Sequence, residues 1–287
     1  MRLITCKYNG VTIAGVLADD QVIVKAEGDD AIYAVRQMIE QEQGATPWLG
    51  GDATIPLNAV KLLAPIPEPR RNIFCVGLNY HDHAKEYHAS DFDKSDKPAI
   101  PSAPVIFTKA TTSVIGPDAP IRSDLDYSKS VDYECELCVV VKKTAHQVKA
   151  AAAEDYIFGY TLLNDVTARQ IQQDHNQWFL GKSLDSFAPM GPAIVTPDEL
   201  PDMGSRQIST TVNDELRQQS TLSQLIFDIP TLIETLTKTM TLLPGDIIST
   251  GTPVGVGLGF TPPKFLKAGD HVTVSFDGIG DLTNPVI

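Results

Sequence analysis

The sequence has little cysteine, and this scarcity excludes a disulfide scaffold. Its 287 residues include four cysteines, Cys6, Cys75, Cys135 and Cys138. Such a low density at this length favours a reducing compartment. Cys135 and Cys138 form a C-x-x-C, but no second pair completes a zinc site, and positions i and i+3 of a strand face opposite sides. We therefore expect buried free thiols.

Basic residues and long apolar runs are scarce as well. The chain has 23 lysines and arginines against 36 aspartates and glutamates, a net charge of −13. This excess argues against nucleic acids and anionic membrane surfaces as partners. No stretch approaches the roughly 18 apolar residues of a spanning helix, and the first residues lack the apolar core of a secretory signal. We expect a cytoplasmic protein, with a mitochondrial location left open.

The composition is that of an ordinary globular protein, with 43% apolar and 21% charged residues. Residues 1–63 alternate short β-like runs with one helical pattern at Asp30–Gln43. Three prolines at alternate positions in residues 64–71 form a stiff, extended connector. These patterns predict a small N-terminal α+β domain over residues 1–63, a linker over 64–71 and a larger domain over 72–287.

An acidic stretch precedes the apolar run Cys138–Val141, which is typical of a buried strand. Because strand side chains alternate between faces, Asp132, Glu134 and Glu136 would point the same way. Carboxylates that lose water together need a cation or protons. A hard divalent cation is the simplest candidate, since it prefers carboxylate oxygen. A strand with a merely solvated polar face is the alternative, and this stretch alone does not separate the two.

A predicted strand at Asn72–Gly77 leads into a helical pattern that we expect to be capped by Asn79. His83 and Glu86 lie three residues apart and share one helical face. A carboxylate beside an imidazole holds its tautomer and raises its basicity, as a general base requires. A solvated helix rich in histidine, aspartate and lysine is the alternative. A charged, proline-punctuated loop follows at residues 90–102.

Three further features lie downstream. Asp165 sits where a strand ends and a helix begins, although a helix N-cap would explain it equally well. Lys182 stands among neutral neighbours in a loop over residues 177–192 and is a candidate anion clamp, or else a surface lysine. The glycine-rich stretch Gly245–Gly257 lacks the ending of a phosphate-binding loop and predicts a tight turn whose N–H groups approach a small ligand.

In this order, five segments resemble the fumarylacetoacetate hydrolase family. The match covers about residues 70–287, and residues 1–63 look like the small, variable N-terminal domain of many members. The resemblance implies an α+β fold, a mixed β-roll or β-sandwich with flanking helices, and a homodimer. The segments are Asn72–Glu86 (NIFCVGLNYHDHAKE), Asp132–Glu136 (DYECE), Asn164–Gln172 (NDVTARQIQ), Gln177–Pro192 (QWFLGKSLDSFAPMGP) and Gly245–Gly257 (GDIISTGTPVGVG).

The resemblance also implies a metal site. The family's E-x-E motif matches Glu134 and Glu136, and its later aspartate matches Asp165. In the family these residues bind Mg²⁺, or Mn²⁺ or Ca²⁺ in some members. Asp132 matches no ligand of the family.

Five more positions match residues that act on the substrate. The family's lid dyad, which orients and activates water, matches His83 and Glu86, and its lysine matches Lys182. Gln172 aligns with a glutamine that contacts substrate in some members. Thr252 aligns with the threonine that holds the substrate carboxylate.

The implied activity is metal-dependent hydrolysis of a C–C bond in β-diketo acids of the acylpyruvate or fumarylpyruvate type, through a stabilised enolate. Two alternatives use the same site: decarboxylation of oxaloacetate and its keto–enol tautomerisation. A non-catalytic ligand-binding member is a further alternative. In every case the expected partner is a small 2-oxo or dicarboxylic acid. The sequence departs from the family in the insert at residues 90–102 and at Gln170, where many relatives have aspartate.

Overall fold

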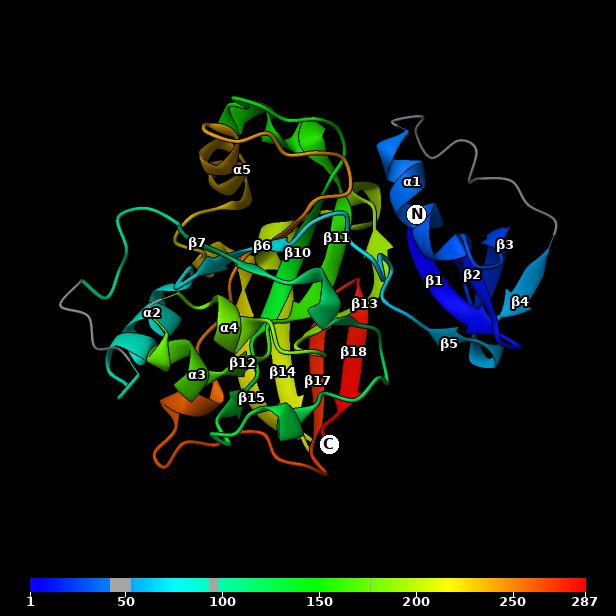
Figure 1. Cartoon of the computed structure of the whole chain (residues 1–287). Helices are drawn as coiled ribbons and strands as arrows, with labels where there is room; N and C mark the ends of the chain where they lie inside the picture. The colour runs from blue at the N-terminus through cyan, green and yellow to red at the C-terminus, as the bar shows by residue number, and fades with distance from the viewer. Residues whose placement is uncertain (42–52, 93–97, 176) are drawn as a thin grey trace.

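The computed structural model describes residues 1–41, 53–92, 98–175 and 177–287 (Figure 1). It confirms the mixed α+β fold. None of the described helices is long and apolar enough to cross a membrane. Residues 93–97 of the charged insert and the end of the helical pattern predicted at Asp30–Gln43 lie outside the described residues.

A large mixed sheet runs through the molecule in the order β4-β3-β2-β1-β13-β11-β10-β16-β6-β7, with β5 added to β1 and β8 to β13. Most neighbours are antiparallel, whereas β16 with β6 and β13 with β8 are parallel. The bounds are β1 Arg2–Tyr8, β2 Val11–Ala18, β3 Gln21–Glu27, β4 Thr54–Pro56, β5 Lys61–Leu62, β6 Ile73–Gly77, β7 Val105–Lys109, β8 Val114–Ile115, β10 Cys135–Val141, β11 Ile157–Asn164, β13 Ala188–Val195 and β16 Ile247–Ser249.

Two smaller sheets and five α-helices complete the described fold. A four-stranded antiparallel sheet has the order β15-β14-β17-β18, and β9 pairs with β12. Helices α2, α3 and α4 gather on one side of the molecule in Figure 1. The bounds are β9 Val131–Asp132, β12 Thr167–Ala168, β14 Gln207–Val212, β15 Glu215–Thr221, β17 His271–Phe276, β18 Gly280–Pro285, α1 Ala31–Glu40, α2 His81–His88, α3 Arg169–Asp174, α4 Phe179–Lys182 and α5 Ile229–Thr237.

Strand β10 is buried along its whole length because apolar layers cover both of its faces. Cys135 and Leu137 belong to a core shared with the four-stranded sheet, which includes Ile208 and Val274. Cys138 belongs to the core on the opposite face. A continuous apolar run is the pattern that a strand buried on both faces requires. All four cysteines are buried and free, as expected.

The N-terminal segment joins the large sheet through one strand pair. Arg2 and Leu3 of β1 pair with Val195 and Ile194 of β13. Apolar side chains of α1 pack in the same core as β1 and β2. The domain boundary after residue 63 stays a prediction.

Three local expectations were wrong. The acidic strand is interrupted, since β9 ends at Asp132 and β10 begins at Cys135. Asn79 does not cap α2, because its side chain bonds instead to the backbone of Phe227 and Thr250. Lys182 ends the short helix α4 rather than lying in a loop.

Candidate active site

Three buried carboxylates converge where β10 begins and β11 ends. Glu134, Glu136 and Asp165 offer oxygens that all lie within 4.8 Å of one another. The strand register explains this meeting, because Cys135 pairs with Asn164 and thus brings the residues on either side together. The Asp165 N–H also donates to the Glu134 carbonyl at 2.8 Å. The structure therefore unites the three residues that the sequence proposed as metal ligands, and it leaves Asp132 outside the group.

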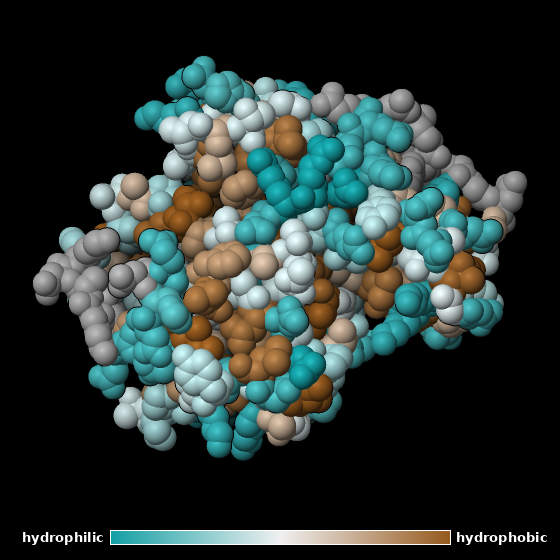
Figure 2. Space-filling model, in the orientation of Figure 1, coloured by the Kyte–Doolittle hydropathy of each residue, from teal (hydrophilic) through white to brown (hydrophobic). Residues whose placement is uncertain are grey.

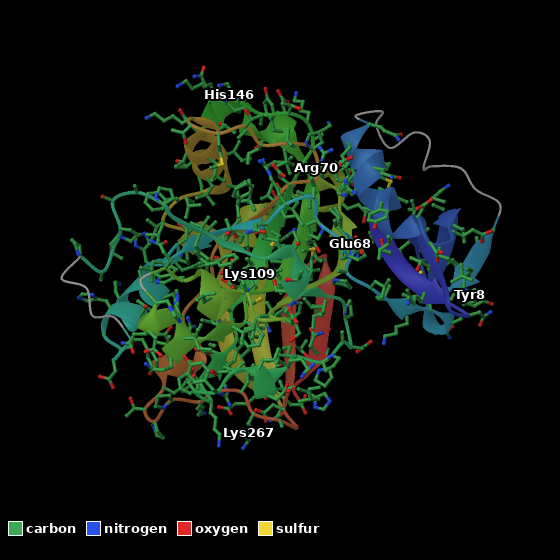
Figure 3. All side chains as sticks on the ribbon, viewed as in Figure 1. Tyr8, Glu68, Arg70, Lys109, His146 and Lys267 are labelled. Atoms are coloured by element: carbon green, nitrogen blue, oxygen red, sulfur yellow. The ribbon has the colours of Figure 1, made fainter. Side chains whose placement is uncertain are left out.

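Two lysines and one arginine approach these carboxylates. The Lys182 ammonium lies 2.8 Å from both Glu134 and Asp165. Lys109 lies 2.6 Å from the other oxygen of Asp165, and an Arg169 nitrogen lies 2.6 Å from Glu134. All three cations are almost completely buried, and Lys109 lies near the middle of the molecule in Figure 3.

The positive charges are unevenly shared. Burial would raise the pKa of Glu134, but the charges of Lys182 and Arg169 outweigh it and lower that pKa to about 2. Burial together with repulsion from Asp165 and Glu134 raises the pKa of Glu136 well above its usual range. Among the described residues, Glu136 makes no direct ion pair; it accepts hydrogen bonds from Ser249 and Gly251.

This arrangement fits a divalent cation. Three oxygen ligands in a buried cluster suit Mg²⁺ or Mn²⁺, which also keep positions for water or substrate. A carboxylate that is buried without an ion pair favours a cation beside it. Glu134, Glu136 and Asp165 are the residues that would hold it.

Helix α2 carries the predicted dyad. His83 Nδ1 lies 3.1 Å from Glu86 Oε2. If Nδ1 carries the proton and donates it to Glu86, Nε2 is left as the basic nitrogen. Both residues are largely buried, and His83 lines the same cavity as Glu134 and Glu136.

The glycine-rich loop after β16 contacts several parts of the site through backbone N–H groups. Gly251 donates to Glu136 at 3.0 Å, and Gly255 donates to Glu86 at 3.0 Å. Gly251 and Gly255 have φ of +104° and +105°, which glycine adopts without strain. The N–H groups of this loop reach the site, but their partners are protein carboxylates, so their approach to a small ligand stays a prediction.

Gln172 and Thr252 lie on the cavity wall with Arg169. Arg169 donates to Gln172 Oε1 at 3.4 Å, and Gln218 donates to Thr252 Oγ1 at 2.8 Å. Because Thr252 accepts this bond, its hydroxyl hydrogen is left to donate to a ligand. The structure thus places both predicted substrate-binding residues at the cavity.

The cavity is small and has an aromatic side. Its volume is about 20 Å³, which is room for about one water molecule. Trp178 packs edge-on to Phe107, with ring centroids 5.3 Å apart, and Tyr87 also lines the space. A ligand larger than a water molecule therefore needs movement of the lining residues to enter, and α2 supplies two of them, His83 and Tyr87.

The sequence analysis missed Lys109 and Arg169. Lys109 ends an ordinary apolar strand, and Arg169 begins an ordinary helix, so local pattern distinguishes neither. Lys109 meets Asp165 through the tertiary fold, across 56 residues of sequence, although β7 and β11 are not neighbours in the sheet. The signal that could have found Arg169 is its spacing of four residues after Asp165, at the start of the helix that follows.

Comparisons with known proteins show what the chain is similar to. A family model described as the fumarylacetoacetate (FAA) hydrolase C-terminal matches residues 72–287. The chain is 46% identical over 261 residues to the oxaloacetate tautomerase YisK of Bacillus subtilis. This match covers 91% of this chain and 84% of that protein.

Solved structures are similar over the whole chain. The fumarylacetoacetate hydrolase EaFAH of Exiguobacterium antarcticum is 36% identical, with a TM-score of 0.83 and coverage of 100% of this chain and 99% of that one. Maleylpyruvate hydrolase from Sphingobium sp. SYK-6 is 29% identical, with a TM-score of 0.78 and the same coverage.

Proposed function

Because the chain belongs to the fumarylacetoacetate hydrolase family, we propose that it is a divalent-metal-dependent tautomerase that interconverts the keto and enol forms of oxaloacetate. The observation that carries the proposal is His83 in one small cavity with the buried carboxylates Glu134 and Glu136. The similarity to a protein named oxaloacetate tautomerase favours this reaction over hydrolysis, which the sequence analysis put first.

The substrate would be held at both ends of its 2-oxo acid group. A divalent cation on the three carboxylates would polarise the keto oxygen and stabilise the enolate. Arg169, Gln172 and Thr252 supply hydrogen-bond donors on the cavity wall for carboxylate oxygens. Lys182 carries a positive charge toward the enolate oxygen, since Asp165 and Glu134 outweigh burial and raise its pKa. One such donor is typically worth about 10²–10³ in rate.

His83 would move the proton. Nε2 takes a proton from C3 of the keto form, and the electron pair of that C–H bond forms the C2–C3 double bond. The protonated imidazole then gives a proton to the enolate oxygen, which completes the enol and restores neutral His83. Glu86 stabilises the transient positive charge through Nδ1, at 3.1 Å.

C–C bond hydrolysis is the second candidate, since the same dyad could activate water. The cavity has room for about one water molecule beside His83. The similarity to maleylpyruvate hydrolase also favours this reaction class. Here His83 would take a proton from water, whose oxygen attacks the distal carbonyl, and the C–C bond would break to release an enolate.

A substrate panel tests the two candidates. Mg²⁺-loaded protein is given oxaloacetate, acetylpyruvate and fumarylpyruvate in parallel, with EDTA-treated protein and Glu134→Gln as controls. We expect metal-dependent loss of the enol absorbance of oxaloacetate with no C–C cleavage of the other two. Cleavage of an acylpyruvate without tautomerisation would assign the second candidate, and no effect on any substrate would reject both.

A further inference from the structure

Asp132 is as deeply buried as the metal-binding carboxylates, yet it neither belongs to their cluster nor lines the cavity. Its two oxygens accept four hydrogen bonds. The donors are the N–H groups of Tyr133, Gly257 and Leu258, at 2.9, 2.6 and 3.0 Å, and Nε of Arg169, at 2.8 Å. Because protein donors already occupy both oxygens, we expect Asp132 to hold the groups around it rather than to bind a ligand.

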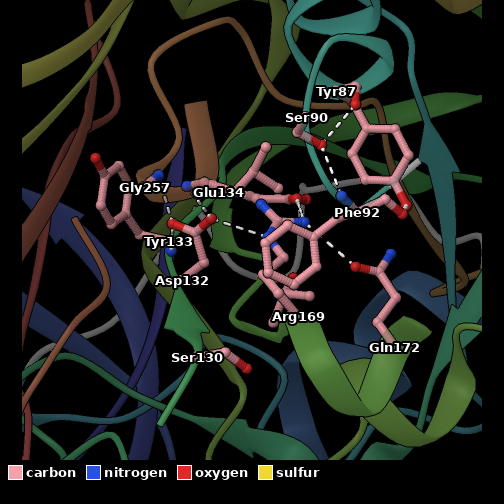
Figure 4. Close-up of polar contacts among 12 residues, drawn as sticks. Tyr87, Ser90, Phe92, Ser130, Asp132, Tyr133, Glu134, Arg169, Gln172 and Gly257 are labelled. Carbon is pink, nitrogen blue, oxygen red and sulfur yellow. Dashed lines mark hydrogen bonds and ion pairs between the residues drawn. The ribbon is translucent and has the colours of Figure 1, made fainter. Parts of the chain in front are cut away.

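Arg169 is the neighbour that reaches the cavity. Its planar guanidinium lies between two carboxylates, as Figure 4 shows, with Nε on Asp132 and Nη1 2.6 Å from Glu134. Nη2 is buried and has no hydrogen-bond partner among the described residues. One contact would leave the planar group free to turn, whereas two contacts fix the direction of the third nitrogen.

We propose that Asp132 is a positioning residue, which holds Arg169 so that Nη2 donates to an oxygen of the bound 2-oxo acid. The identity of that ligand rests on the proposed function. Asp132 also binds the turn at Gly257–Leu258, and this turn belongs to the loop that carries Thr252. Asp132 thereby joins Arg169 to the loop that carries the second donor, Thr252, although these two donors come from distant parts of the chain.

The substitution Asp132→Asn separates positioning from simple support of the turn. Asparagine keeps the size of the side chain and one oxygen acceptor, but its NH₂ group cannot accept from Arg169 and Leu258. Asp246→Asn is the matched control. Asp246 is also a buried carboxylate that accepts from an arginine, Arg71 at 2.8 Å, and it lies outside the cavity.

Calorimetry with oxalate measures the effect without turnover. Oxalate presents charged oxygens on two adjacent carbons, as the enolate of a 2-oxo acid does with its carboxylate and enolate oxygens. The Mg²⁺-loaded wild type is compared with Asp132→Asn, Arg169→Lys, the double variant and Asp246→Asn. We expect Asp132→Asn to weaken oxalate binding about 10- to 100-fold. The double variant should bind oxalate no more weakly than Arg169→Lys alone, because both substitutions remove the same interaction, the bond from Arg169 to the ligand. Asp246→Asn should lower the melting temperature and leave the affinity unchanged.

The outcomes are distinct. Losses that add in the double variant, an Asp132→Asn affinity equal to wild type, or no oxalate binding by the wild type would each overturn the inference. If Asp132→Asn does not fold, Asp132→Glu takes its place, because one added methylene displaces the carboxylate; unchanged affinity there overturns the inference as well. A wild type that shows this coupling but does not tautomerise oxaloacetate would reject the proposed function and retain the role of Asp132.

Discussion

At the scale of single residues, the site depends on how charge is shared among groups that have lost their water. Glu134, Glu136 and Asp165 were predictable because acidic residues are unusual beside apolar strands and matched a family pattern. Lys109 was not, and the spacing from Asp165 is the one local signal of Arg169, since each pairs with a carboxylate far away in the sequence. A sequence pattern shows which buried carboxylates need a positive charge beside them. The tertiary structure shows which lysine or arginine provides that charge.

The raised pKa of Glu136 leads to a pH-dependent metal affinity. Burial and the neighbouring carboxylates make the unbound protein retain a proton on Glu136 above the usual range. Because a cation binds the carboxylate form, Mg²⁺ must displace this proton, so the affinity should rise with pH until Glu136 is ionised. Calorimetry in buffers of different ionisation enthalpy should detect proton release. An affinity independent of pH, without proton release, would contradict this assignment.

Lys109 should matter most when no metal is bound. Its ammonium contacts Asp165 in a fully buried pair, although burial lowers the pKa of Lys109. Lys109→Met should destabilise the metal-free protein by up to about 3–5 kcal/mol, because the buried Asp165 carboxylate loses one of its two lysine partners and keeps Lys182 alone.

The control for that variant is Lys149→Met, which removes an exposed ion pair with Glu234. Exposed pairs contribute about 0–1 kcal/mol, so this change should be small. Urea unfolding with and without Mg²⁺ checks both variants. Equal losses in the free energy of unfolding for the two variants would show that the buried ion pair contributes no more to stability than the exposed one.

At the scale of elements, local pattern located individual strands: the predicted strand Asn72–Gly77 matches β6, and the apolar run Cys138–Val141 lies in β10. Breaks within elements were harder to foresee. The interruption before Cys135 depends on the β9–β12 pairing and on donors to Asp132 from a distant loop. Asn79 stands where a helix cap is expected, yet its side chain donates to the backbone carbonyls of Phe227 and Thr250 instead.

Helix α2 is joined to the glycine-rich loop through Glu86, and this bond can be separated from the action of Glu86 on His83. Glu86→Gln keeps an oxygen for the Gly255 N–H but loses the negative charge beside the imidazole. We expect kcat to fall about 10²-fold or more, with little change in KM. Glu86→Ala should also raise KM, because the helix loses its bond to the loop. Steady-state kinetics of both variants checks this, and identical KM values would contradict a role for Gly255 in holding α2.

At the scale of the whole molecule, sequence reasoning predicted the fold class, and similarity to solved structures over the full chain confirms it. The pairing of β1 with β13 was not predictable, because strand alternation does not identify the partner. The surface in Figure 2 is a mosaic of polar and apolar residues. The predicted homodimer stays a prediction.

The fold also shields the four cysteines from solvent. All four are buried, and burial raises the pKa of Cys6 to about 11 and that of Cys135 to about 12. Because the thiolate is the reactive form, none should react with a disulfide reagent such as DTNB at neutral pH. All four should react after denaturation in guanidinium chloride. Rapid modification of a thiol in the native protein would contradict this expectation and show that the core around that cysteine opens readily.

The most direct test of the central claim is exchange at C3 of oxaloacetate. The Mg²⁺-loaded protein is mixed with oxaloacetate in D₂O, and the C3 protons are followed by NMR beside His83→Asn and EDTA-treated protein. The account predicts accelerated replacement of the C3 protons by deuterium while oxaloacetate stays intact, with the acceleration lost in both controls. Exchange no faster than in buffer, or conversion of oxaloacetate to pyruvate as the main reaction, would contradict it.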